Sequence, residues 1–132
     1  MIVLDTDAVS ELLRRGPLDR LPQRLARTNP ETLSTTAITL GELAYGAARV
    51  GRVDLFAQAQ RVLREVRVLD FDRSAAETYG AIRAALERKG TRLADPDLRI
   101  AAIVVGRGAT LVTGNVKHFA RVPGLKVENW LR

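Results

Sequence analysis

Three acidic residues stand where a parallel α/β fold would bring them together. Asp5 follows Ile2-Val3-Leu4, an unbroken apolar run that predicts a short strand buried on both faces. Glu42 and Asp97 each stand near the start of a predicted helix. Because the carboxyl ends of parallel strands and the amino ends of the helices after them share one edge of a sheet, we expect these carboxylates to meet.

A cluster of carboxylates has a chemical use. Neighbouring carboxylates repel one another and resist ionisation, and a divalent cation relieves that repulsion. Mg²⁺ takes oxygen ligands and is usually held by a few carboxylates, waters and a substrate phosphate, and Mn²⁺ suits the same ligands. The absence of cysteine and the presence of one histidine argue against zinc. We therefore expect Asp5, Glu42 and Asp97 to be ligands of Mg²⁺ or Mn²⁺.

Two further polar residues follow another predicted strand. Thr113 ends the strand predicted over 109–113, and Asn115 comes two residues later. The Thr113 hydroxyl could place a water molecule, and the Asn115 amide offers a neutral oxygen beside the carboxylates. These two residues complete the set of candidate catalytic groups with Asp5, Glu42 and Asp97.

Each of these residues also has a purely structural interpretation. Thr39 and Glu42 have the spacing of a capping box at the start of a helix. Asp95 suits an N-cap before Pro96, and Asp97 in the first turn would favour the helix dipole by about 0.3–1 kcal/mol. Gly114-Asn115 is common turn chemistry. Each structural interpretation is sufficient for its own residue. The prediction of a common site rests on the expected position of all these residues at one edge of the sheet.

The elements that must position these residues alternate between strand and helix. The apolar patterns predict strands over residues 2–4, 33–38, 66–69, 109–113 and 126–128. They predict helices beginning just after Asp5, over 18–27, 39–50, 53–64 and 74–89, and from Asp95 onward, with Gly16-Pro17 ending the first. The body of the last helix, Ile100–Val105, is apolar nearly all round and is expected to be buried. This alternation predicts an α/β fold with a parallel sheet of four to five strands and right-handed crossovers.

Length and composition set the remaining bounds. The 132 residues are expected to form one domain, residues 1–132. The sequence has 21 Lys and Arg against 15 Asp and Glu, a net charge of +6, which favours a polyanionic partner such as nucleic acid but also fits an arginine-rich coding bias. No apolar stretch is long enough to cross a membrane, and nothing supports secretion, so a cytoplasmic protein without a membrane partner is expected.

An ordered set of motifs over nearly the whole chain resembles one family, the PIN-domain ribonucleases, and within it the VapC-type toxins of type II toxin–antitoxin pairs. The matching segments are 3–7 with 10–12, 39–46, 68–72 with 75–76, 97–102, 111–115 with 119, and 122–130. The resemblance implies a three-layer α/β/α fold with strand order 3-2-1-4-5 and Mg²⁺- or Mn²⁺-dependent cleavage of RNA. It also implies a homodimer and inhibition by a cognate antitoxin protein.

The resemblance carries Asp5, Glu42 and Asp97 over as the acidic metal ligands. The sequence departs from the family pattern at two places. Asp7 stands where Asn is common, and the fourth acidic position falls on Asn115 or near His118. The number of metal ions and the roles of Asp7, Asn115 and His118 therefore stay open at this stage.

The main hypothesis is a metal-dependent endoribonuclease that acts as a toxin. One alternative is a phosphoryl-accepting receiver domain, with Asp5 and Asp7 after the first strand, Asp70 as acceptor and Thr113 after the fourth strand. The second alternative is a nucleic-acid-binding module without catalysis, in which every acid is a helix cap.

Overall fold

Five parallel strands form one central sheet. The computed structural model of the chain describes residues 1–14, 16 and 19–131. The strands lie in the order β3-β2-β1-β4-β5, which confirms the predicted order and the predicted α/β class. Their bounds are β1 Ile2–Leu4, β2 Leu33–Thr36, β3 Arg67–Leu69, β4 Thr110–Val112 and β5 Lys126–Glu128. Because β1 lies in the middle, the residue that follows it is placed at the centre of the carboxyl edge.

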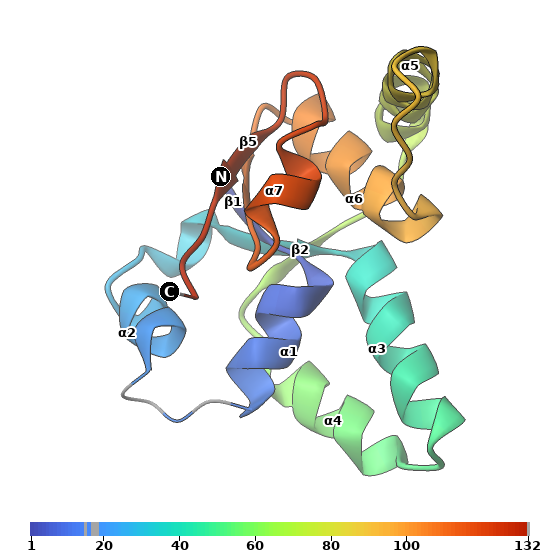
Figure 1. Cartoon of the computed structure of the whole chain (residues 1–132). Helices are drawn as coiled ribbons and strands as arrows, with labels where there is room; N and C mark the ends of the chain where they lie inside the picture. Colours follow the sequence, from blue (N-terminus) through green and yellow to red (C-terminus); the bar gives the residue numbers. More distant parts are fainter. Residues whose placement is uncertain (15, 17–18, 132) are drawn as a thin grey trace.

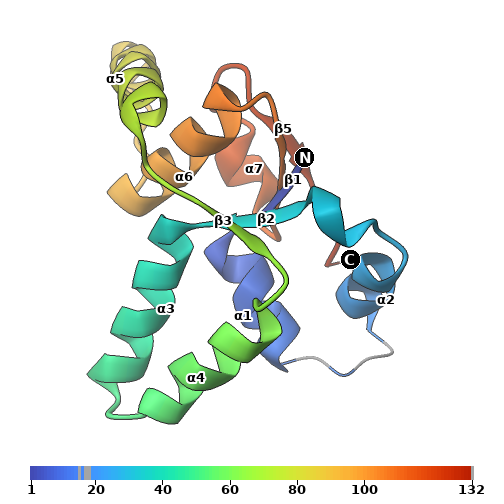
Figure 2. The same cartoon turned by 180° about the vertical axis from the view of Figure 1, so that it is seen from behind.

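Helices cover both faces of this sheet, so the fold has the three expected layers (Figures 1 and 2). In the view of Figure 1, α5 and α6 lie above β2, and α1, α2 and α4 lie below it. The helices are α1 Thr6–Arg14, α2 Arg20–Ala26, α3 Ala37–Arg49, α4 Val53–Val62, α5 Arg73–Arg88, α6 Asp95–Gly106 and α7 Val116–Phe119, with a 3₁₀ turn at Pro30–Thr32.

Alternating side chains of the strands feed two separate cores. Val3 and Leu111 pack with α5 and α6 on one face, whereas Leu4 and Val112 pack with α1 and Trp130 on the other. All four strand side chains are at most 1% exposed. This alternation follows from the period of two in a strand, and it explains why the central strands are apolar without interruption.

The observed element ends differ from the predicted ones by at most two residues. The strand predicted over 33–38 ends at Thr36, because Thr36 is the N-cap of α3 and accepts a hydrogen bond from the Thr39 amide at 3.1 Å. The helix predicted over 39–50 therefore begins two residues earlier, at Ala37. The short α7 was not predicted. Pro17 and Leu18, assigned to the first helix end and the second helix, lie outside the described residues.

Helix α6 is the buried element on the α5 side of the sheet. Its residues Leu98 and Ile100–Val104 are at most 6% exposed, which confirms the expectation drawn from its apolar body except at Val105, which is half-buried. The helix begins at Asp95, so the fixed position of its body fixes the first turn as well. Among the described residues, none of the helices has the length and apolar character needed to cross a membrane.

Candidate active site

Asp5 lies at the carboxyl end of the central strand and is only 4% exposed. The chain turns directly into α1, and Asp5 Oδ1 accepts a hydrogen bond from the Ala8 amide at 2.7 Å, so this carboxylate also caps the helix. Its own amide donates to Val112 O at 3.2 Å, which ties it to the end of β4. Thr113, fully buried, is hydrogen-bonded to the Asp5 carboxyl through its side chain.

The surroundings of Asp5 disfavour its charged form. Burial raises the pKa of the Asp5 carboxyl from its ordinary 3.8 to about 6. The hydrogen bonds from Thr113 and Ala8 oppose this rise, while the charges of Asp7 and Asp97 add to it. A carboxylate held in this way gains from a neighbouring cation, which offsets both the burial and the repulsion.

Glu42 lies one turn farther into α3 than a capping residue would. The prediction that Thr39 and Glu42 could form a capping box is wrong, because Thr36 caps this helix. The freed Glu42 carboxylate accepts a hydrogen bond from Thr6 Oγ1 at 2.5 Å, and Thr39 Oγ1 lies 3.2 Å from the same Thr6 oxygen. Thr6 follows Asp5 directly, so Glu42 is tied to the segment that carries the central acid.

Asp97 lies in the first turn of α6, as predicted, and is half-buried. Its Oδ2 lies 3.0 Å from Nε2 of His118. The expected role of Asp95 as the helix cap is wrong: the N-cap position is Ala94, and Asp95 instead accepts hydrogen bonds from Tyr79 and Arg99. These partners lie on α5 and one turn along α6, so the Asp95 carboxylate is engaged outside the cluster.

The loop after β4 brings the last polar groups to the same edge. The backbone amide of Asn115 donates to Thr113 Oγ1 at 3.0 Å, and the Asn115 side chain is exposed. Gly114 lies under Asp7: a Cβ added at this glycine would stand 2.5 Å from Asp7 Oδ2 and 3.0 Å from Leu131 Cδ2. The missing side chain of Gly114 therefore makes room for the Asp7 carboxylate.

One open pocket collects these groups. Four of the five candidate catalytic residues line it, together with Asp7; Thr113 lies behind the pocket wall, bonded to Asp5. The lining residues are Asp5, Thr6, Asp7, Ser10, Arg14, Glu42, Asp97, Gly114, Asn115 and Phe119. Sequence reasoning left the role of His118 open and missed Thr6. The threonines at the end of β2 and the start of α3, Thr35, Thr36 and Thr39, were a usable signal for hydroxyl contacts at this edge.

The donor set fits a hard divalent cation. The pocket offers carboxylate and amide oxygens, and a cation there would offset the burial, and the smaller repulsion from Asp7 and Asp97, that together raise the pKa of Asp5. Within residues 1–14, 16 and 19–131, no three acidic or histidine side chains are close enough to form a ready-made metal site. A divalent ion at this pocket would therefore need water molecules between itself and part of its protein ligands, as Mg²⁺ usually keeps.

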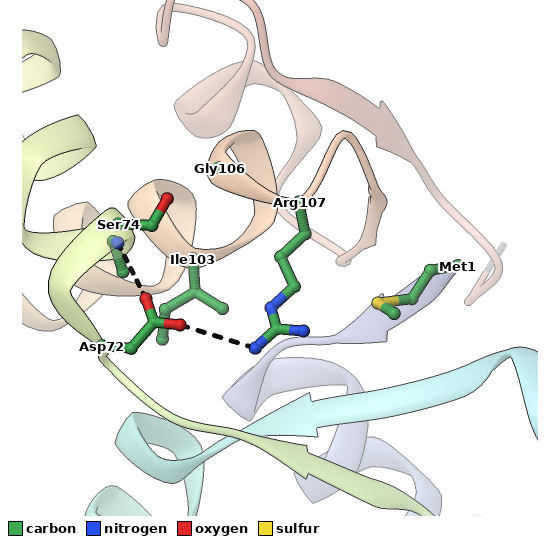
Figure 3. A pocket seen from close by; sticks show the side chains of 7 residues that line it. Met1, Asp72, Ser74, Ile103, Gly106 and Arg107 are labelled. Atoms are coloured by element: carbon green, nitrogen blue, oxygen red, sulfur yellow. Dashed lines mark hydrogen bonds and ion pairs between the residues drawn. The ribbon is translucent and has the colours of Figure 1, made fainter.

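A second pocket lies elsewhere and does not contain these acids (Figure 3). Asp72 caps α5 by accepting from the Ala75 amide at 2.9 Å, and its other oxygen lies 3.7 Å from Arg107 at the end of α6. These contacts hold the two helices together. They give this pocket a structural explanation.

The strand order also argues against a phosphoryl receiver. In flavodoxin-like receivers the first and third strands are neighbours, so the acids after them share a site. Here β2 lies between β1 and β3, and the exposed Asp70 follows an edge strand. Asp70 is thereby separated from Asp5, and the receiver alternative loses its acceptor.

Comparison with known families agrees with this geometry. The model of the PIN domain family matches residues 2–125. The chain is 34% identical to the tRNA(fMet)-specific endonuclease VapC of Salmonella typhimurium, over 97% of this chain and 96% of the relative. The chain belongs to the PIN-domain family of VapC ribonucleases. Another relative, Ribonuclease VapC2 of Rickettsia felis, is 35% identical over 80% of this chain and 78% of its own length.

Solved structures of VapC relatives have the same fold. The chain superposes on a chain of the DNA-bound VapBC of Salmonella typhimurium with a TM-score of 0.91 and 34% identity, covering 98% of this chain and 97% of the other. A chain of VapBC2 from Rickettsia felis, bound to a DNA fragment from its promoter, gives a TM-score of 0.88 with 32% identity over 98% and 99% of the two chains. VapBC systems are toxin–antitoxin systems, so this PIN-domain chain belongs to a family of ribonuclease toxins.

Proposed function

We propose that this VapC-family chain, as one domain over residues 1–132, is an Mg²⁺-dependent endoribonuclease. The observation that carries the proposal is the pocket lined together by Asp5, Glu42 and Asp97. Mn²⁺ is the alternative ion, because it accepts the same oxygen ligands. When bound, the ion supplies charge neutralisation at the scissile phosphate and a more acidic water.

The residues of the pocket divide into groups with different tasks. Asp5 and Asp97 are the direct ligands, since one is buried at the strand end and the other is fixed by the buried α6. Glu42 is half-buried in α3, where it completes the ligand set or orients the attacking water. Thr113 holds the Asp5 carboxyl by a hydrogen bond, and the exposed Asn115 amide is placed to contact phosphate or water.

RNA is the proposed substrate, and the charge of the chain supports it. A net charge of +6 draws a polyanion despite the acids in the pocket. Arg14 lines the same pocket, with its guanidinium 2.9 Å from Glu11, and is placed to meet the RNA backbone at the rim. Binding should weaken steeply with salt, as expected for contacts with phosphates.

The test is cleavage of RNA by the folded Asp97→Asn variant. Initiator tRNA is the first substrate to assay, because the Salmonella relative is named for it. The wild type should cleave with Mg²⁺ and not with EDTA, and Asp97→Asn should lose at least a hundredfold, as expected when a charged group at the reacting phosphate is removed. Asp70→Asn, an exposed acid outside the pocket, is the matched control. Full activity of folded Asp97→Asn would remove Asp97 from the mechanism.

A cognate antitoxin is the proposed partner. An apolar groove between α1, α3 and α4, lined by Leu13, Leu43 and Leu55, shares Thr6 and Glu42 with the acidic pocket. A partner helix in this groove could place a basic side chain among the carboxylates. Leu55→Glu should weaken antitoxin binding and leave RNA cleavage intact. An unchanged antitoxin affinity would place the partner elsewhere.

A homodimer in the cytoplasm is the proposed working form. Large apolar side chains are exposed around the corner between α3 and α4, with Tyr45 67%, Val50 56% and Val53 80% exposed. Burying them against a second copy would remove that surface from water. Sedimentation of the chain alone should give a dimer, and Val53→Asp should shift it toward the monomer.

A further inference from the structure

Two residues after β4 form a line of contacts that ends on Asp97. The guanidinium Nη2 of Arg121 lies 2.9 Å from Nδ1 of His118, and Nε2 of the same ring lies 3.0 Å from Asp97 Oδ2. The His118 imidazole therefore stands between a cation and a pocket carboxylate, with each ring nitrogen facing one of them.

These contacts select one form of the His118 ring. A guanidinium can only donate hydrogen bonds, so Nδ1 facing Arg121 must accept. The proton of the neutral imidazole is then on Nε2, which donates to the Asp97 carboxylate. A ring protonated on both nitrogens, or on Nδ1 alone, would set two donors against each other at Arg121.

Arg121 is itself held in place from three sides. Its Nε donates to the carbonyl of His118 at 3.1 Å, and its Nη2 also lies 3.4 Å from the carbonyl of Arg92, in the loop between α5 and α6. Across the described part of the chain, Arg121 has no carboxylate within salt-bridge distance. The partners of its Nε and Nη2 are thus neutral acceptors, and the ring nitrogen of His118 is one of them.

The ring is fixed on its other side by the core. His118 meets Phe119 edge to face, with the ring centroids 5.2 Å apart, and Phe119 is 2% exposed. Asp97 is fixed from below by the buried α6. The carboxylate and the imidazole therefore meet between two rigid supports, which leaves the Asp97 oxygens little freedom to rotate.

We propose that Arg121 and His118 are positioning residues that orient the Asp97 carboxylate toward the cation. The Nε2 proton engages Oδ2, and in the described residues Oδ1 has no hydrogen bond, so that oxygen is left to bind the ion. Carboxylate ligands of metals are commonly held by such outer contacts, whose loss costs about 10- to 100-fold in metal affinity. The inference rests on the proposed metal centre and assigns the device that orients one of its ligands.

The first test measures which nitrogen of the His118 ring carries the proton. His118 is the sole histidine of the chain, so ¹⁵N-labelled protein gives one imidazole signal set. At pH 7.5 without metal, long-range ¹H–¹⁵N spectra should show Nε2 protonated and Nδ1 unprotonated. Arg121→Met should change the Nδ1 shift, and Arg121→Lys, which can still donate, should keep it closer to the wild type. A wild-type ring protonated on Nδ1 would overturn the proposal, whatever the fate of the metal centre.

The second test measures Mn²⁺ affinity by electron paramagnetic resonance, without an activity assay. His118→Leu should weaken Mn²⁺ binding about 10- to 100-fold. His118→Gln, whose amide can donate from nearly the position of Nε2, should restore most of it, and the exposed neighbour variant Lys117→Ala should be unchanged. The glutamine variant also guards against loss of folding by the leucine variant.

The outcomes separate the two ideas. If the wild type binds Mn²⁺ and His118→Leu binds it equally well, the positioning role is wrong and the metal centre stands. If the wild type binds no Mn²⁺, the proposed metal centre fails and the positioning role fails with it. If glutamine does not rescue while the fold is intact, the Nε2 proton is not what orients Asp97.

Discussion

The buried Asp5 carboxyl should make the metal-free protein less stable when it is ionised. Because the folded chain binds this proton more tightly than the unfolded chain, the neutral carboxyl contributes its full stability below a pH of about 4. That contribution is lost as the pH rises through about 6, the raised pKa of the folded state. Asp5→Asn removes the charge and keeps the shape, so it should be more stable than the wild type above pH 6.

The size of the effect follows from the two pKa values. One pH unit corresponds to about 1.36 kcal/mol, so a rise from 3.8 to about 6 amounts to about 3 kcal/mol. The asparagine oxygen can still accept from the Ala8 amide, which is 2.7 Å from Oδ1 in the wild type, so the helix cap is kept. We therefore expect Asp5→Asn to raise the free energy of unfolding by up to about 3 kcal/mol at pH 7.5 and by only about 1 kcal/mol at pH 4.5.

Urea unfolding at the two pH values, in EDTA and in Mg²⁺, measures this directly. In Mg²⁺ the difference in unfolding free energy between Asp5→Asn and the wild type should become smaller or change sign. A cation that binds the folded wild type stabilises it, and the variant offers that cation one ligand fewer. The exposed Asp70→Asn is the control, and it should stay within about 0.5 kcal/mol of the wild type at both pH values. If Asp5→Asn is no more stable than the wild type at pH 7.5 in EDTA, burial does not disfavour the Asp5 charge.

Three other changes test the supports of the pocket. Thr36→Ala removes the cap of α3 and should lower the free energy of unfolding by about 1 kcal/mol in urea, with no loss if the cap is idle. Gly114→Ala puts a methyl group where the Asp7 carboxylate lies and should weaken Mn²⁺ binding severalfold; wild-type affinity would show that Asp7 can move away freely. Thr6→Val removes the hydrogen bond to Glu42 and should slow RNA cleavage roughly tenfold, since a bond to a charged group contributes about 1.5–3 kcal/mol. An unchanged rate would show that Glu42 needs no anchor.

Local patterns were enough to predict the sheet and the place of Asp5. The run Ile2-Val3-Leu4 is fully apolar because its strand is central, so its burial and its end at Asp5 follow from composition alone. The apolar body of α6 likewise predicted a buried helix, which in turn placed Asp97. In both cases the continuous apolar character of a segment was enough to predict its burial.

The errors came from residues with several possible partners. Thr36 and Thr39 both suit an N-cap, and the cap falls on Thr36 because the strand pairing with β3 ends there, where Thr36 is opposite Leu69. Asp95 suits a cap as well, but Tyr79 and Arg99 take its carboxylate. The contact of His118 with Asp97 spans 21 residues and has no local signature. Which partner wins depends on packing that the local sequence does not contain.

The contrast between α6 and α3 has a mechanical consequence. Asp97 is attached to a helix enclosed on nearly every side, while Glu42 rides on a helix that pairs with α4 at the margin of the molecule (Figure 1). If the proposed ion draws the acids together, we expect the buried α6 to move less than the peripheral α3. Binding of the ion would then shift α3 and α4 slightly toward the pocket. Through this shift, the occupancy of the pocket would be coupled to any partner bound in the groove between α1, α3 and α4.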